Sequence, residues 1–121
     1  MNNLAYLYAE NNGNKEVALS IAQKAHDLAP GQPDVMDTLG FTLLKNNQPA
    51  EAAKILEKAS KMLNDNPTIK YHLALAFVEL KQNDKAIAVL DEALAAGDFP
   101  SVEKCRTLLK ELKKNKSLTQ S

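Results

Sequence analysis

The sequence predicts an all-α fold, an α-α solenoid in which consecutive helical hairpins stack and a C-terminal helix closes the stack. Three observations lead to this prediction. Leu and Ala carry most of the apolar content, and the 121 residues include only four Gly and five Pro, a balance that favours helix over strand. Apolar residues recur at three- and four-residue spacing. These features return at a step of 34 residues, as from Pro33 to Pro67.

The first copy of the repeat covers residues 1–31. Leu4 and Ala5 lie on its first predicted helix, and the polar turn NNGN at 11–14 separates that helix from a second one. Because no polar helix precedes this copy, we expect an uncapped apolar flank there that supports self-association. The second helix has a face of small residues at helical spacing, formed by Ala18, Ala22 and Ala25.

The second copy covers residues 32–65, and its two helices are separated by the turn NNQP. Gly40 on the first helix and Ala52 on the second are expected where the two backbones approach closely. Leu39 and Leu56 fill the space beside them. This copy therefore predicts an antiparallel helical pair held together by a narrow, small-residue contact.

The third copy covers residues 66–98, with the turn KQND between its helices. It repeats the pattern of the second copy with Leu73, Ala74, Phe77, Ala86, Leu90 and Ala93. Residues 100–114 then predict one more helix, whose apolar face would cover the surface that the last hairpin leaves open. We expect one domain over 1–115 and a disordered tail over 116–121, where apolar residues are too few to pack.

With this period, the sequence resembles the tetratricopeptide repeat (TPR) family. The family pattern has Leu, a small residue and a large apolar residue in the first helix, then Ala, a large apolar residue and Ala in the second. The resemblance covers residues 2–97. Met36 and Lys70 stand where the pattern has Trp, and the Gly of the turn between the helices is missing or displaced. Three phrases, NNLAYLYAE, DTLGFTLL and FPSVEKCRTLLKEL, are also similar to bacterial multi-repeat proteins of exopolysaccharide-export type systems.

The resemblance implies a right-handed superhelix whose concave groove is lined by the first helix of each hairpin, where a peptide or partner helix lies. Aligning the copies at residues four apart gives the expected lining. The candidate partner-binding residues are Asn2, Tyr6, Glu10, Asp37, Phe41, Lys45, Tyr71, Leu75 and Glu79.

The aromatic residues of this set have two interpretations. Tyr6, Phe41 and Tyr71 are either packing residues between helices or anchors for a ligand. The family's peptide-binding members imply a clamp of Lys, Asn and Arg that holds a ligand carboxylate. In this sequence the comparable positions of the first helices do not have these residues. Binding of chaperone C-termini is therefore disfavoured.

Several classes of function lack support in the sequence. Fifteen basic and fifteen acidic residues cancel, so no global field attracts nucleic acid. No apolar run reaches membrane-spanning length. His26, His72 and the lone Cys105 show no metal-ligand or catalytic spacing, which predicts no enzyme activity, no metal and no cofactor. The basic cluster near the C-terminus is interpreted as a solubilising face of the last helix.

We therefore interpret the chain as a non-catalytic scaffold that binds a protein or peptide. The alternatives are a structural C-terminal segment of a larger array and an accessory domain of an enzyme, each with its binding surface elsewhere. The sequence carries no targeting signal, so a cytoplasmic and a periplasmic location stay open, as do the partner and the pathway.

Overall fold

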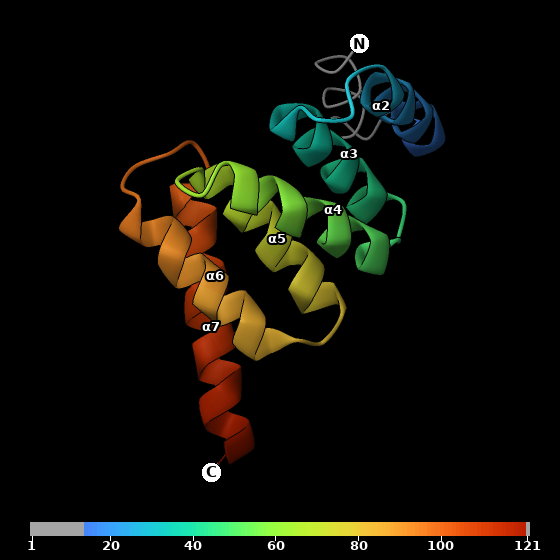
Figure 1. Ribbon diagram of the computed structural model, residues 1–121. Helices are drawn as coiled ribbons and strands as arrows, with labels where there is room; N and C mark the ends of the chain where they lie inside the picture. Colours follow the sequence, from blue (N-terminus) through green and yellow to red (C-terminus); the bar gives the residue numbers. More distant parts are fainter. Residues whose placement is uncertain (1–13, 121) are drawn as a thin grey trace.

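Every regular element within residues 14–120, the part of the chain that the computed structural model describes, is an α-helix (Figure 1). The all-α solenoid predicted from the sequence is confirmed. The helices are α2 (Lys15–Leu28), α3 (Pro33–Lys45), α4 (Pro49–Met62), α5 (Pro67–Glu79), α6 (Asn83–Ala95) and α7 (Val102–Gln120).

Local sequence explains where the helices begin. Pro33, Pro49 and Pro67 each occupy the first turn of a helix, where the missing N–H costs nothing and the fixed φ suits the helix. Asn14 caps α2, because its side-chain oxygen accepts hydrogen bonds from the backbone N–H groups of Glu16 and Val17 at 3.0 and 3.1 Å.

The turns inside the two complete hairpins have the same geometry. Asn47 and Lys81 follow α3 and α5 with φ of 61° and 63°, in the left-handed region that normally favours Gly. The next residues donate backbone hydrogen bonds back across the turn, Gln48 N–H to Leu43 O at 2.9 Å and Gln82 N–H to Phe77 O at 2.8 Å. Each helix therefore ends in a Schellman motif built without Gly.

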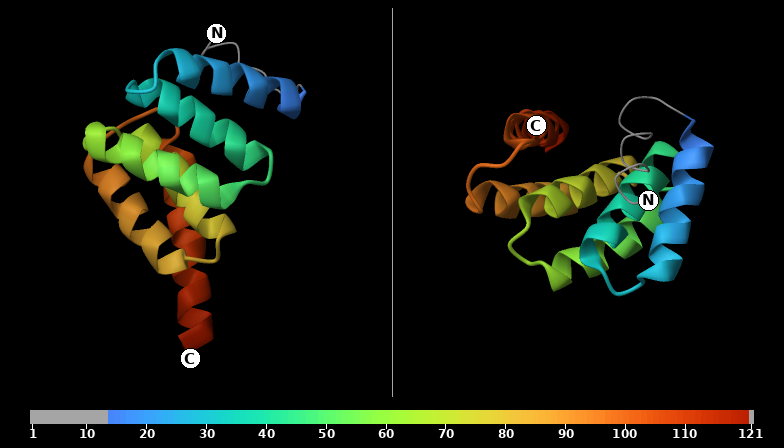
Figure 2. Two further views of the ribbon diagram at one scale, coloured as in Figure 1. Left: turned by 45° about the vertical axis from the view of Figure 1, so that its right-hand side comes forward. Right: turned by 90° about the horizontal axis from the view of Figure 1, so that it is seen from above.

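Consecutive helices pack against one another from α2 to α7, so α2 and α7 lie at opposite ends of the stack (Figures 1 and 2). The contact between α3 and α4 depends on Gly40, where an added Cβ would lie 2.4 Å from Cγ of Leu56. Leu56 and Leu90 are fully buried in one core cluster together with the small residues Ala52 and Ala86. The predicted small-residue contacts are thus part of the core.

The last helix covers the end of the stack. Val102, Cys105, Leu109 and Leu112 are buried in the same core as α6. Figure 2, seen from above, shows α7 nearly end-on while α6 is seen from the side. A disordered tail was expected from residue 116, but the helix continues to Gln120. No Pro or Gly interrupts the segment NKSLTQ, so the backbone can stay helical there.

Candidate functional site

The first helices of the second and third hairpins, α3 and α5, lie in contact with each other. They carry six of the predicted partner-binding residues: Asp37, Phe41 and Lys45 on α3, and Tyr71, Leu75 and Glu79 on α5. Asn2, Tyr6 and Glu10, like the uncapped flank expected to self-associate, lie outside the described residues. Within the described residues, the candidate groove thus consists of positions on α3 and α5.

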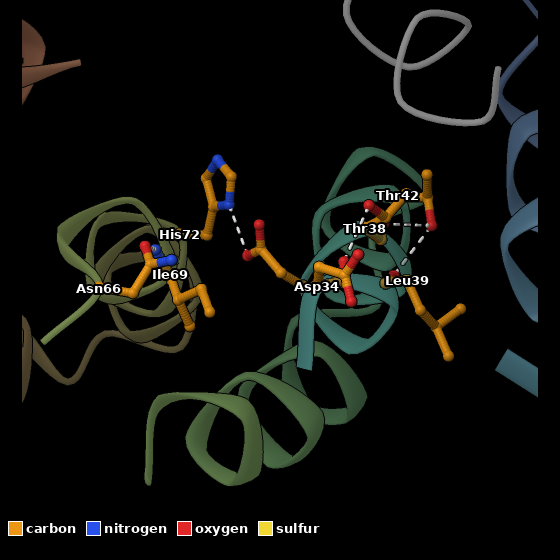
Figure 3. Close-up of polar contacts among 8 residues, drawn as sticks. Asp34, Thr38, Leu39, Thr42, Asn66, Ile69 and His72 are labelled. Atoms are coloured by element: carbon orange, nitrogen blue, oxygen red, sulfur yellow. Dashed lines mark hydrogen bonds and ion pairs between the residues drawn. The ribbon is translucent and has the colours of Figure 1, made fainter. Parts of the chain in front are cut away.

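A partly buried hydrogen bond joins the two helices. Nδ1 of His72 lies 2.7 Å from Oδ1 of Asp37, and the side chains are 3% and 13% exposed. A carboxylate only accepts, so the imidazole donates. Figure 3 shows the His72 side chain on the side of α5 that faces α3. In the sequence, His72 shows no metal-ligand or catalytic spacing. In the structure, its side chain forms a hydrogen bond between two repeats.

The Phe41 ring packs on this pair. Its centroid lies 4.8 Å from that of His72, with the two rings tilted by 39°. Phe41 is only 5% exposed and also packs with Ala18 of α2. These contacts favour the packing interpretation of Phe41 over that of an exposed anchor. On the solvent side, the Lys45 ammonium lies 5.1 Å from the ring centroid, within the range of a cation–π contact.

The other candidates remain accessible to different degrees. Tyr71 and Leu75 are half-buried, and Lys45 and Glu79 are exposed. The Tyr71 ring centroid lies 6.0 Å from that of His72. The arrangement is a mixed surface of aromatic, apolar and charged side chains above a layer formed by the buried His72 and Phe41 and the half-buried Asp37.

Lys70 is a polar residue that the sequence analysis did not identify as functional. It is 6% exposed, and its Nζ lies 3.2 Å from Glu92 Oε1 and 3.5 Å from Ser60 Oγ. A signal for its burial was present, because Lys70 falls on the helical stripe that contains Leu73, Ala74 and Phe77.

The lone thiol lies inside the helix pair at the C-terminal end. Cys105 is fully buried, and its Sγ donates to the Leu90 carbonyl at 3.9 Å. Burial raises the pKa of the Cys105 thiol, and the neighbouring Arg106 opposes that change. Such a thiol is a weak nucleophile.

Residues 14–120 contain no cluster of three metal-ligating side chains. None of the helices in this part of the chain combines the length and apolar content needed to cross a membrane.

Helical hairpins that stack in register, each contacting only its neighbours, define a helical repeat protein. The model of the tetratricopeptide repeat family matches residues 43–112, which is more than half of the chain. The chain belongs to the tetratricopeptide repeat family, whose repeats mediate interactions between proteins.

Similar proteins agree with this assignment. The crystal structure of the P58(IPK) TPR domain superposes with a TM-score of 0.80 at 19% identity. The alignment covers 99% of this chain and 35% of the P58(IPK) chain. The first TPR domain of human RPAP3 has a TM-score of 0.76 at 14% identity and covers 96% and 92% of the two chains. Both likenesses concern the fold alone.

A human protein, the O-mannosyl-transferase TMTC3, is 31% identical over 85 residues, which are 70% of this chain. The chain spans 9% of that protein's length. The likeness therefore concerns a short stretch of a much larger protein.

Proposed function

We propose that the chain is a scaffold that binds a protein or peptide in a groove over α3 and α5. The observation that carries this proposal is the layer of Asp37, His72 and Phe41 between α3 and α5, whose contacts fix the spacing of the two helices. A preorganised surface binds with a smaller entropy loss than a mobile one. Family membership supports the proposal, because repeats of this kind present extended concave surfaces.

The side chains above this layer would make the contacts. Tyr71 and Leu75 offer apolar area, while Lys45 and Glu79 offer opposite charges. Such a surface suits a peptide with one apolar anchor flanked by polar residues. Phe41 would position its neighbours rather than touch the peptide, because its ring packs against Lys45 and His72 and does not face the solvent.

Leu75→Glu tests this groove. Leu75 is half-buried and does not belong to the packed core clusters, so the variant should fold. Leu63→Glu is the matched control, because Leu63 is 40% exposed and lies at the end of α4. Partners captured by the wild type and by Leu63→Glu should be lost with Leu75→Glu, as judged by mass spectrometry. Equal capture by both variants would remove the groove from the proposal.

A second candidate function is an accessory repeat segment of a larger enzyme. The similarity to a protein O-mannosyl-transferase over 85 residues favours it. In that role the repeats would hold a protein substrate while another domain carries out the transfer. Sequencing the natural gene on both sides of this stretch tests the idea, and a reading frame without any transferase domain would contradict it.

A further inference from the structure

A second cleft lies away from the α3–α5 contact, between α4 and α6, with α5 at its floor. Its volume is about 360 Å³, and its walls include Ser60, Lys70, Phe77, Lys85, Val89 and Glu92. We refer to it as the Lys70 cleft. Leu73 and Phe77 make its floor apolar, and both are buried in the core.

The preceding repeat contains the same cleft with different chemistry. Seven residues line that earlier cleft, and each lies 34 positions before a residue that lines the Lys70 cleft. Met36 takes the place of Lys70 there and packs with Ala59 and Ile69. An apolar side chain thus fills this position in one repeat, whereas an ammonium group occupies it in the next.

The stability of the fold does not explain why a lysine occupies position 70. Moving an ammonium group out of water is costly, and replacing a buried charge by an apolar side chain of similar size is often neutral or stabilising. The partner carboxylate offers little compensation, since the Glu92 side chain is 59% exposed and exposed ion pairs contribute little.

The Lys70 ammonium is also incompletely bonded. It has three N–H donors, and two of them reach Glu92 and Ser60. The third has no acceptor among the residues that the structure describes. Because Lys70 lines the cleft, this donor is available to a group that enters from solvent.

The charges of the cleft indicate which group would enter. Lys61, Lys70 and Lys85 oppose Glu57 and Glu92 along its walls, which leaves one positive charge in excess. A single carboxylate balances this excess, while a doubly charged phosphate would exceed it. The apolar floor suits the methylene groups that precede a glutamate carboxylate.

We infer that the Lys70 cleft is a second binding site, which accepts a glutamate side chain from an acidic segment of a partner protein. The incoming carboxylate accepts a hydrogen bond from the third N–H of the Lys70 ammonium, beside Glu92. Glu92 keeps its contact with Lys70 and competes with the incoming carboxylate for the same positive charge. The site is independent of the proposed groove, because it uses none of the groove residues.

The test measures fluorescence anisotropy of a labelled, amidated peptide of alternating glycine and glutamate, with the glutamine version as the uncharged probe. Lys70→Met copies Met36 of the preceding repeat and should fold. It should weaken binding of the glutamate peptide about tenfold, the loss expected for one charge-assisted hydrogen bond. The matched control is Lys104→Met, which removes an equal charge from an exposed position on α7 and should change binding less than about twofold.

Glu92→Gln provides an independent readout, because its side chain is largely exposed and the fold does not depend on it. Removing the competing carboxylate should tighten binding of the glutamate peptide several-fold. Equal losses in Lys70→Met and Lys104→Met would overturn the inference, since they would indicate general charge attraction. Unchanged binding in Glu92→Gln would also overturn it. Neither result would affect the groove proposed over α3 and α5.

Discussion

His72 on α5 donates a 2.7 Å hydrogen bond to Asp37 on α3, 35 positions earlier in the chain. The repeat step is 34 residues, so the bond joins positions that are not strictly equivalent. Thr38 stands 34 positions before His72, so the imidazole is specific to the third repeat, and its bond to Asp37 fixes how α3 lies against α5.

Replacing Asp37 tests the strength of this link. Asp37→Ala removes the carboxylate that accepts a hydrogen bond from the buried His72 side chain, which should lower the free energy of unfolding by about 1–3 kcal/mol. Asp65→Ala is the control, because Asp65 is exposed and makes no such bond. Urea denaturation followed by circular dichroism measures both values. A loss in Asp37→Ala no greater than in Asp65→Ala would show that the bond contributes nothing to stability.

The close approach of α3 and α4 leads to a second prediction. Gly40→Ala would place a Cβ 2.4 Å from Cγ of Leu56, a side chain with 0% exposure that has no room to move. Overpacking of this kind costs about 1–3 kcal/mol, which exceeds the gain of about 1 kcal/mol that Ala brings to a helix. We expect a lower thermal midpoint.

Gly31→Ala is the matched control for this substitution. No atom lies within 4 Å of the Cβ that it would add, and Gly31 lies between α2 and α3. Its stability should be unchanged or slightly increased, because Ala restricts the unfolded chain. If both variants behaved alike, the contact between Gly40 and Leu56 would not limit the packing.

The turns of the hairpins lead to a third prediction. Lys81 adopts a φ of 63° at the end of α5, and a non-Gly residue in this region costs about 1–2 kcal/mol. Lys81→Gly should therefore raise the free energy of unfolding by about 1 kcal/mol. Asn47→Gly should have a smaller effect, because Asn tolerates the left-handed conformation better than Lys. Equal gains from both variants, or none from Lys81→Gly, would contradict this explanation.

Much of this fold could be predicted from the sequence, because each helix must bury one apolar stripe and the stripes recur at a constant step. Leu39, Leu56, Leu73 and Leu90 are buried as that reasoning requires. The periodicity also indicated the closing helix, since Cys105 and its apolar neighbours share one face.

The polar interior could not be predicted in the same way. A stripe identifies the buried face but not whether a charged residue on it finds a partner, as Lys70 does with Ser60 and Glu92. The candidate groove shows the same limit. The spacing placed Phe41 and Leu75 at equivalent positions, but Phe41 is buried and Leu75 half-buried. Their exposure depends on how closely α3 and α5 approach, which side-chain contacts such as that of Asp37 with His72 decide.

The buried thiol leads to a prediction about pH. Burial raises the pKa of Cys105, so the folded protein keeps the thiol proton at a pH where the unfolded chain has lost it. The stabilisation linked to this proton is fully present below the pKa of the unfolded chain, about 8.5. It declines as the pH rises above that value toward the folded pKa.

Cys105→Ala removes this titration while keeping a small apolar side chain between α6 and α7. We expect the wild type to be more stable than Cys105→Ala near neutral pH, because the alanine leaves space in a fully buried position. The difference in the free energy of unfolding should shrink as the pH rises above about 8.5, the pKa of a free thiol. Comparing the two proteins cancels the other groups that titrate in this range. A difference that stays constant with pH would mean that the thiol ionises equally well in the folded and unfolded chains.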